Sequence, residues 1–285
     1  MNIPDGIKNE ITLFIGAGGG FDVFAALPLS MKCQSGIFIN YGQHKGFKIR
    51  QSTEEDYPEY GLAPITYTLG RNGVQDVRDG IQEIVDTYAV DTIFVIDGGV
   101  DSLMRGDEEN QGTVLEDFIV MAAVDQIDVP HKYLACVGFG AETEEGLNHY
   151  RALENISALT MTGDFLGSCS LLKDSREYKA YKILCEEAWE GNRKSHIQSK
   201  IILATEGEFG DVGMDGADAQ VYNQETSVNF ISPLMSIYWF FNLDGVIKRN
   251  LVIEKIRESR SFTDAMMLYR QSIQPHTRPK QVIPL

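Results

Sequence analysis

The chain has 285 residues, of which 43% are hydrophobic, so it is long enough for one large or two small globular domains. Its formal net charge of −16 opposes nonspecific binding to nucleic acid and to anionic membranes, because both carry negative charge themselves. No Pro/Ser-rich linker divides the sequence. We therefore predict a single α/β domain spanning residues 1–285, with C-terminal helices and an extended tail packed on it, and no nucleic acid or membrane partner.

Three features favour the cytoplasm. The sequence starts polar and lacks the basic-then-apolar order of a signal peptide. Its most apolar later segment, residues 233–241, is far shorter than the roughly 20 residues of a membrane-spanning helix. Four cysteines occur without a Cys-X-X-Cys pair, which is typical of reduced, buried thiols: Cys33, Cys136, Cys169 and Cys185.

The first predicted strand, residues 11–15, runs directly into a glycine loop and a helix start. The loop, residues 16–20 (GAGGG), brings backbone N–H groups and a helix N-terminus together, an arrangement suited to phosphate. It is not the dinucleotide fingerprint, whose third glycine would fall at Phe21, and no Gly-Lys-Ser/Thr of a P-loop follows. The loop either contacts a ligand or forms a structural turn; its candidate ligand-binding residues are Gly18, Gly19 and Gly20.

Asp22 stands at the start of the helix that follows this loop. It either caps the helix or points into the site. In the second case it would repel a phosphate unless a cation lay between the two groups. Asp22 is therefore a candidate metal ligand.

Strands and helices alternate in the next part of the chain. Residues 36–40 and 65–69 are predicted strands, separated by a long polar loop. Residues 77–88 have apolar side chains at helical spacing, and residues 92–96 form a continuous apolar run typical of a strand covered on both faces. This alternation predicts an α/β, three-layer, Rossmann-like fold with a mainly parallel sheet.

The acidic loop after this strand, residues 97–108 (DGGVDSLMRGDE), is the strongest functional signal in the chain. In an open α/β sheet, ligands bind beyond the carboxyl ends of the strands, where this loop would lie. The candidate catalytic residues are Asp97, Asp101 and Arg105, the candidate ligand-binding glycines are Gly98 and Gly99, and Asp107 is a candidate metal ligand.

An amphipathic helix is predicted at residues 114–127. Glu116 and Asp117 fall in its first turns, where the helix dipole favours acids, so a structural role competes with a catalytic one. Thr113 and Glu116 have the spacing of a capping box.

Two further predicted strands, residues 132–137 and 157–161, are followed by glycine and an acid, Glu142 and Asp164 respectively. A site at one edge of the sheet produces such a recurrence, although glycine and aspartate are also common turn residues. We expect the ligand site to be formed by the loops after the strands that end at Ile15, Ile96, Val137 and Met161.

The remaining segments complete the predicted fold. The apolar segment 233–241 is more often buried core than an interface. The tail after residue 273 should be extended because it contains two prolines. Its His276 and Arg278 would lie over the acidic loops, as a structural clasp or as a substrate contact. Helices are predicted at 175–190, 196–204, 252–256 and 262–272, and a strand at 228–231.

Five segments carry the most distinctive residues: 18–23 (GGGFDV), 97–108, 112–117 (GTVLED), 233–244 and 274–278 (QPHTR). Together they resemble a family of microbial cytosolic proteins of unknown function, and the resemblance spans nearly the whole chain. It implies a single domain and a site built from these motifs. It implies no particular reaction.

The acids favour a small-molecule enzyme, a hydrolase or transferase, that binds a phosphorylated or nucleotide-like substrate with a divalent cation. Asp22 and Asp107, with Asp97 and Asp101, offer the oxygen ligands that Mg²⁺ prefers. Asp101 would serve as general base once neighbouring acids raise its pKa. The glycine-loop amides and Arg105 would stabilise developing negative charge.

Two alternatives use the same residues. A non-catalytic, nucleotide-binding regulatory module needs the same loops, and an oligomeric structural protein would use residues 233–241 as the interface of a homo-oligomer. Other chemistries fit less well. A Ser/His/Asp hydrolase would need a Gly-X-Ser-X-Gly elbow, and a zinc site would need clustered His or Cys; the sequence has neither.

Overall fold

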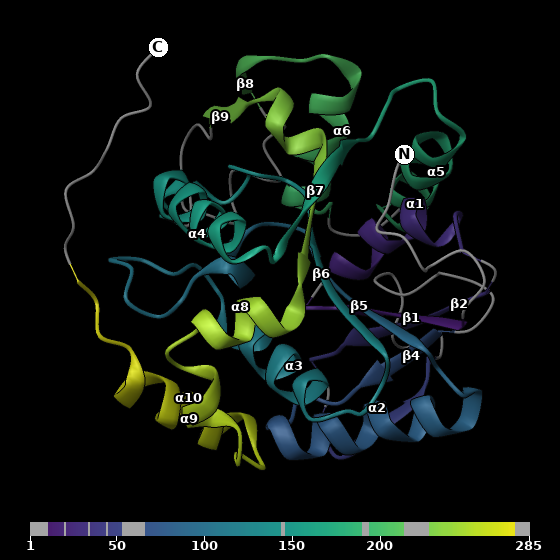
Figure 1. Cartoon of the computed structure of the whole chain (residues 1–285). Coiled ribbons are helices and arrows are strands. Elements are labelled where there is room, and N and C mark those ends of the chain that lie inside the picture. The colour runs from purple at the N-terminus through teal and green to yellow at the C-terminus, as the bar shows by residue number, and fades with distance from the viewer. Residues whose placement is uncertain are drawn as a thin grey trace.

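A computed structural model describes residues 11–19, 21–33, 35–43, 45–52, 66–143, 146–189, 194–213 and 228–276. One eight-stranded sheet forms its centre, in the order β3-β4-β2-β1-β5-β6-β10-β7 (Figure 1). The strands β4, β2, β1, β5 and β6 are parallel, whereas β3 and β10 run antiparallel to their neighbours. The strands are β1 (Ile11–Gly16), β2 (Ser35–Tyr41), β3 (Ile49–Gln51), β4 (Thr66–Leu69), β5 (Thr92–Asp97), β6 (His131–Cys136), β7 (Phe165–Ser170) and β10 (Ile237–Asn242).

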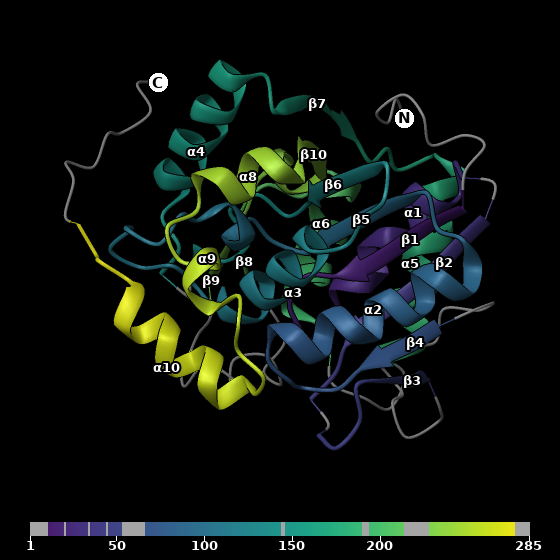
Figure 2. The same ribbon diagram turned by 60° about the horizontal axis from the view of Figure 1, so that its bottom comes forward.

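Helices cover both faces of this sheet, which gives the predicted three-layer α/β architecture (Figures 1 and 2). One face carries α2 (Val74–Tyr88), α3 (Leu115–Asp125), α4 (His149–Thr162), α8 (Leu243–Arg249), α9 (Ile253–Ile256) and α10 (Phe262–Ser272). The other carries η2 (Asp22–Ala26), α1 (Leu27–Ser30), α5 (Arg176–Trp189) and α6 (His196–Glu206). Short elements complete the described chain: η4 (Asp101–Leu103), η7 (Pro233–Ser236), and a separate two-stranded antiparallel sheet of β8 (Gly210–Gly213) and β9 (Val228–Ile231).

The apolar strands are continuous because both of their faces are buried. In β1, Leu13 and Ile15 pack into the core on the α2/α3 side, while Phe14 packs on the α5/α6 side. Phe14 stacks there between Phe38 of β2 and Phe94 of β5. Side chains that alternate between two cores need an apolar residue at every position, which explains the lack of a period-two pattern.

The chain reverses its direction of progress across the sheet between β1 and β5. From β1 it moves outward to β2 and β4, and from β5 it moves the opposite way to β6. The connection after β1 passes through η2 on one face, whereas the connection after β5 passes through α3 on the other. Open α/β sheets bind ligands where two connections diverge in this way, so a ligand is expected at the carboxyl ends of these two strands.

Residues 157–161 are not the short strand that we predicted. They belong to α4, whose buried Ala152, Ile156 and Leu159 follow helical spacing, and Met161 is 84% exposed. The strand is β7, which begins after Asp164. Since β6 and β7 both pair antiparallel with β10, they run in the same direction. Asp164 precedes β7, so it lies at the amino ends of the parallel strands, opposite the carboxyl ends of β1 and β5. The loop after Met161 therefore takes no part in the site.

Most of the apolar segment 233–241 is core, and only Pro233 and Leu234 at its start are exposed. It forms η7 and most of β10, between β6 and β7 in the sheet. Phe240 and Phe241 are buried on opposite faces, and Trp239 packs against Phe139 and Phe165. Among the helices of the described ranges, none combines the length and the apolar character that crossing a membrane requires.

Candidate functional site

Three aspartates from three different elements meet near the carboxyl ends of β1 and β5. Asp22 begins η2, Asp97 ends β5, and Asp117 lies in the first turn of α3. Each offers one carboxylate oxygen, and these oxygens lie within 4.8 Å of one another. We call Asp22, Asp97 and Asp117 the acid cluster. The sequence pattern predicts Asp22 and Asp97 as site residues, whereas Asp117 has a competing helix-dipole role.

Both glycine loops hold Asp22. Its Oδ2 accepts a hydrogen bond of 2.8 Å from the backbone N–H of Gly18, and its Oδ1 accepts one of 3.2 Å from Gly98. The carboxylate is thereby clamped between the loop after β1 and the loop after β5. Because Gly98 has no Cβ, Asp22 can approach its backbone; a Cβ at that position would lie 2.7 Å from Oδ1.

Asp97 is held by its own loop. Its Oδ2 accepts hydrogen bonds from the backbone N–H and the hydroxyl of Ser102, and the Gly99 amide also donates to this carboxylate. The Ser102 hydroxyl also lies 3.4 Å from Cys136 Sγ at the end of β6. Burial raises the pKa of this thiol, which favours its uncharged form beside Asp97.

Asp117 keeps an unsatisfied carboxylate oxygen. The residue is only 3% exposed, and its Oδ1 has no hydrogen-bond partner among the described residues. The predicted capping box of Thr113 and Glu116 is absent, because the N-cap of α3 is Val114 and no side chain caps it. A buried acceptor without a donor is unfavourable unless a proton or a cation satisfies it.

Two further buried acids surround the cluster. Asp101 accepts a hydrogen bond of 3.1 Å from the backbone N–H of Thr113, and Glu142 accepts one of 2.7 Å from Val100. Glu142 fits because Gly99 has no side chain; a Cβ there would lie 2.4 Å from the Glu142 carboxyl carbon.

Burial and mutual repulsion shift the acids toward their neutral forms. Desolvation is the main cause for each: it raises the pKa of Asp97 to about 6 and the pKa values of Asp22, Asp101 and Asp117 well above the ordinary range. Repulsion by Asp97 further raises the pKa of Asp22, and repulsion by Asp117 further raises that of Asp101. At neutral pH the set is strained by its own charge unless protons or a cation neutralise it.

The glycine amides bind the protein's own carboxylates. Gly18 and Gly98 donate to Asp22, Gly99 donates to Asp97, and Gly19 donates to Glu116 Oε2 at 3.1 Å. These amides therefore orient acids, and the ligand contact predicted for the glycines stays a prediction. Gly20 lies outside the described residues.

Arg105 and Asp107 lie away from the cluster. The Arg105 Nε atom is 3.7 Å from Asp107 Oδ1. Asp107 is not one of the acids of the acid cluster. The buried carboxylate of Glu108 instead fixes this turn, accepting hydrogen bonds from the Arg105 and Gly106 amides and from Asn155. The structure thus brings together Asp22 and Asp97 with Asp101 beside them, and not Arg105 or Asp107.

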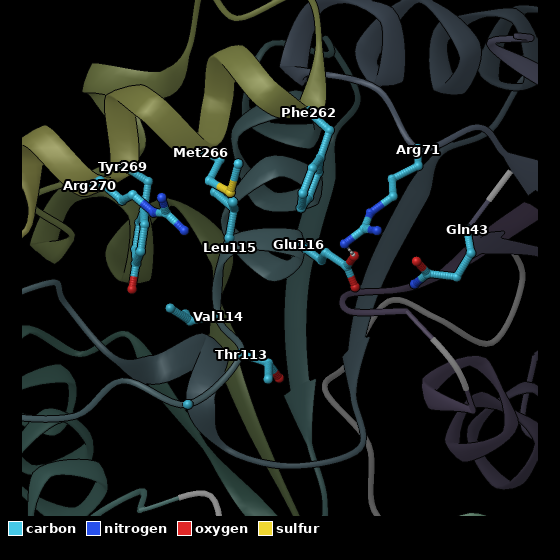
Figure 3. A pocket seen from close by; sticks show the side chains of 11 residues that line it. Gln43, Arg71, Thr113, Val114, Leu115, Glu116, Phe262, Met266, Tyr269 and Arg270 are labelled. Atoms are coloured by element: carbon cyan, nitrogen blue, oxygen red, sulfur yellow. Dashed lines mark ion pairs between the residues drawn. The ribbon is translucent and has the colours of Figure 1, made fainter. Parts of the chain in front are cut away.

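A pocket of about 540 Å³ adjoins the cluster (Figure 3). Glu116 connects the pocket with the glycine loop that holds Asp22. Its Oε2 accepts a hydrogen bond from the Gly19 amide, and its Oε1 lies 2.9 Å from Arg71 Nη2. Arg71 also stacks on the Phe262 ring of α10, with 3.9 Å between the guanidinium carbon and the ring centroid. The pocket is lined by Gln43, Arg71, Gly112, Thr113, Val114, Leu115, Glu116, Phe262, Met266, Tyr269 and Arg270.

The described part of the tail contacts the acidic loop through its backbone. The Gln274 amide donates to the Gly106 carbonyl at 3.2 Å, and the His276 amide donates to the Asp107 carbonyl at 2.9 Å. The His276 side chain is exposed, and Arg278 lies outside the described residues. Backbone hydrogen bonds therefore hold the described part of the tail on the acidic loop.

Comparison with known proteins identifies a family. The family described as "Protein of unknown function (DUF1152)" matches residues 65–274. The chain belongs to this family. The matched segment contains Asp97, Asp117 and the α10 wall of the pocket, whereas Asp22 and its glycine loop precede it. A search of curated proteins found no match.

Proposed function

We propose that this DUF1152 protein is a divalent-cation-dependent enzyme, a hydrolase or transferase that acts on a phosphorylated or nucleotide-like small molecule. The observation that carries the proposal is the convergence of Asp22, Asp97 and Asp117, whose carboxylate oxygens lie within 4.8 Å of one another. The unsatisfied Oδ1 of buried Asp117 adds to it.

The donor set fits a hard cation. Three carboxylate oxygens and no thiol or imidazole make up the described cluster, and Mg²⁺ and Ca²⁺ prefer oxygen ligands. An ion at the centre of three oxygens within 4.8 Å of one another lies no more than about 2.8 Å from each, close to the roughly 2.0–2.6 Å distances usual for these cations. Bound there, Mg²⁺ would neutralise the acids and polarise a phosphoryl oxygen of the substrate.

The pocket suits the organic part and the anionic group of such a substrate. Its volume of about 540 Å³ lies in the usual range for small-molecule sites. Leu115, Phe262 and Met266 supply apolar surface, while Arg71 and exposed Arg270 supply positive charge in a strongly acidic protein. Arginine is suited to bidentate contact with phosphate oxygens.

Asp101 is the proposed general base. It is buried beside the cluster, and the Thr113 amide orients its Oδ2 from the rim of the pocket. Burial raises its pKa, and repulsion by Asp117 and Glu142 raises it further, which would make the carboxylate a stronger proton acceptor once a bound cation has displaced its proton. A cytoplasmic location is part of the proposal, because the four cysteines form no disulfide and reduced thiols are usual there.

A thermal-shift screen tests this function. Nucleotides, sugar phosphates and dinucleotides would be added to the protein with and without Mg²⁺ or Mn²⁺, and the screen repeated on Asp97→Asn. A compound that raises the melting temperature only with the cation, and only in the parent protein, supports the proposal and names a substrate class to assay. Failure of every compound to shift the parent, with or without cation, would refute it.

A further inference from the structure

A buried glutamine faces the acid cluster from the face of the sheet opposite the pocket. Gln198 lies in the first turn of α6 and is 1% exposed. The Tyr181 hydroxyl of α5 donates to its Oε1. Burial raises the pKa of this phenol, so it stays protonated and acts as the donor. The carbonyl end of the amide is thus occupied, and the N–H end points away from Tyr181.

The free end of this amide points toward Asp22. A Cβ built on Gly98 would lie 2.7 Å from Gln198 Nε2 and 2.7 Å from Asp22 Oδ1. The two groups therefore lie close together beside Gly98, where the lack of a side chain lets both approach its backbone. Among the described residues, Nε2 has no hydrogen-bond acceptor, since the bonds of Gln198 are those with Tyr181 and Ser195.

A neutral donor among buried acids suits a particular kind of ligand. Carboxylates alone repel an anionic oxygen, whereas an amide N–H binds it without adding a charge that would compete with a cation. The Tyr181 hydrogen bond fixes which end of the amide is presented.

We propose that Gln198 donates its Nε2–H to an oxygen of a phosphate group held at the acid cluster, and that Tyr181 is the positioning residue for this amide. The inference rests on the proposed function and extends it, because it assigns the phosphate's second contact to α6, across the sheet from Arg71. The substrate's phosphate would then lie beside the cation ligands, within hydrogen-bond reach of Gln198.

The test separates cation binding from phosphate binding. Mn²⁺ would be titrated into the metal-free protein and its free concentration followed by electron paramagnetic resonance. Inorganic phosphate and pyrophosphate would then be titrated into the Mn²⁺-loaded protein by calorimetry. The variants are Gln198→Met, which keeps the length of the side chain, and Tyr181→Phe, which removes one hydroxyl. Gln75→Met is the matched control, since Gln75 is another buried glutamine, bonded to the Arg257 carbonyl.

We expect Gln198→Met to weaken phosphate or pyrophosphate binding about 10- to 100-fold, and Tyr181→Phe about 3- to 10-fold, with Mn²⁺ affinity within about twofold of the parent. Gln75→Met should change neither affinity. If Gln198→Met does not fold, the phosphate affinity of Tyr181→Phe alone tests the inference.

Equal phosphate affinity in the parent and the folded variants would overturn the inference and leave the cation site standing. The same conclusion holds if the Mn²⁺-loaded parent binds neither phosphate nor pyrophosphate. If the parent does not bind Mn²⁺, both the inference and the proposed function are refuted.

Discussion

The backbone amide of Gly98 donates a hydrogen bond of 3.2 Å to Oδ1 of Asp22, across 76 positions of sequence. This bond ties the loop after β1 to the loop after β5, at the point where the chain changes direction across the sheet. The acid cluster is therefore a product of the strand order. No local motif contains it.

The pH dependence of stability should reveal the buried acids. A carboxyl whose folded pKa is raised binds its proton more tightly in the folded state, so stability is highest below the ordinary pKa and falls as pH rises through the folded value. For Asp97, the rise from 3.8 to about 6 corresponds to about 3 kcal/mol, lost between about pH 4 and pH 6. Asp22, Asp101 and Asp117 shift in the same direction and extend the loss to higher pH.

We therefore expect the metal-free protein in EDTA to be less stable at pH 8 than at pH 5, as measured by urea unfolding. Addition of Mg²⁺ or Mn²⁺ should recover stability at pH 8 and have little effect at pH 5. A metal-free protein whose stability is flat or rising between these pH values would show that the acids are not strained.

Asp117→Asn should separate stability from cation binding. The change keeps the shape of the side chain and removes one buried charge that faces Asp97 and Asp22. Without cations at pH 8 we expect about 2 kcal/mol of added stability, or about 5 °C in melting temperature. The stabilisation by Mn²⁺ should disappear in the same variant.

Two acids serve as matched controls for Asp117. Asp107 lies in the same acidic loop but beside Arg105, and Asp164 lies at the opposite edge of the sheet. Asp107→Asn and Asp164→Asn should both keep the full Mn²⁺ response. Loss of that response in either control would show that the cation binds elsewhere than at the acid cluster.

The fold was largely predictable because its signals are local. Residues 13–15 and 93–96 are apolar at every position, as is typical of strands between two helical layers, and both runs became central parallel strands. Asp22 and Asp97 could be assigned to one site because each follows such a strand. The short apolar run ending at Met161 was misread, since five residues cannot distinguish a strand from the last turns of a helix.

The rest of the site depends on contacts between distant residues. Asp117 has a sufficient local role at the start of α3, and only the packing of α3 against β5 brings it to Asp97. Gln198 lies in an ordinary amphipathic helix, and nothing near it in the sequence indicates that its amide faces Asp22. Arg71 gains its position from Glu116 and from Phe262, far along the chain.

Gly99→Ala should damage the site through sterics. The added methyl would lie 2.4–2.6 Å from the Glu142 carboxyl atoms, which the Val100 amide holds in place. We expect about 1–3 kcal/mol of destabilisation in urea. Gly36→Ala is the control, because its nearest contact would be 3.3 Å from Ser30 Cβ. Equal effects of the two changes would argue against a fixed Glu142.

Arg71→Met should weaken substrate binding and leave the cation site intact. The methionine keeps apolar contact with Phe262 and removes the charge paired with Glu116. For whichever phosphorylated ligand the screen identifies, we expect about 10- to 100-fold weaker binding by calorimetry, because charge-assisted hydrogen bonds are lost. An unchanged affinity would show that the pocket is not part of the substrate site.

The central claim is that one cation binds where Asp22, Asp97 and Asp117 converge. It is tested most directly by calorimetric titration of Mg²⁺ into the metal-free protein at pH 7, in two buffers with different enthalpies of ionisation. Because the acids hold protons that a cation must displace, we predict one ion per chain, a binding enthalpy that depends on the buffer, and loss of binding in Asp97→Asn. No binding, or binding that releases no proton and survives Asp97→Asn, would contradict the account.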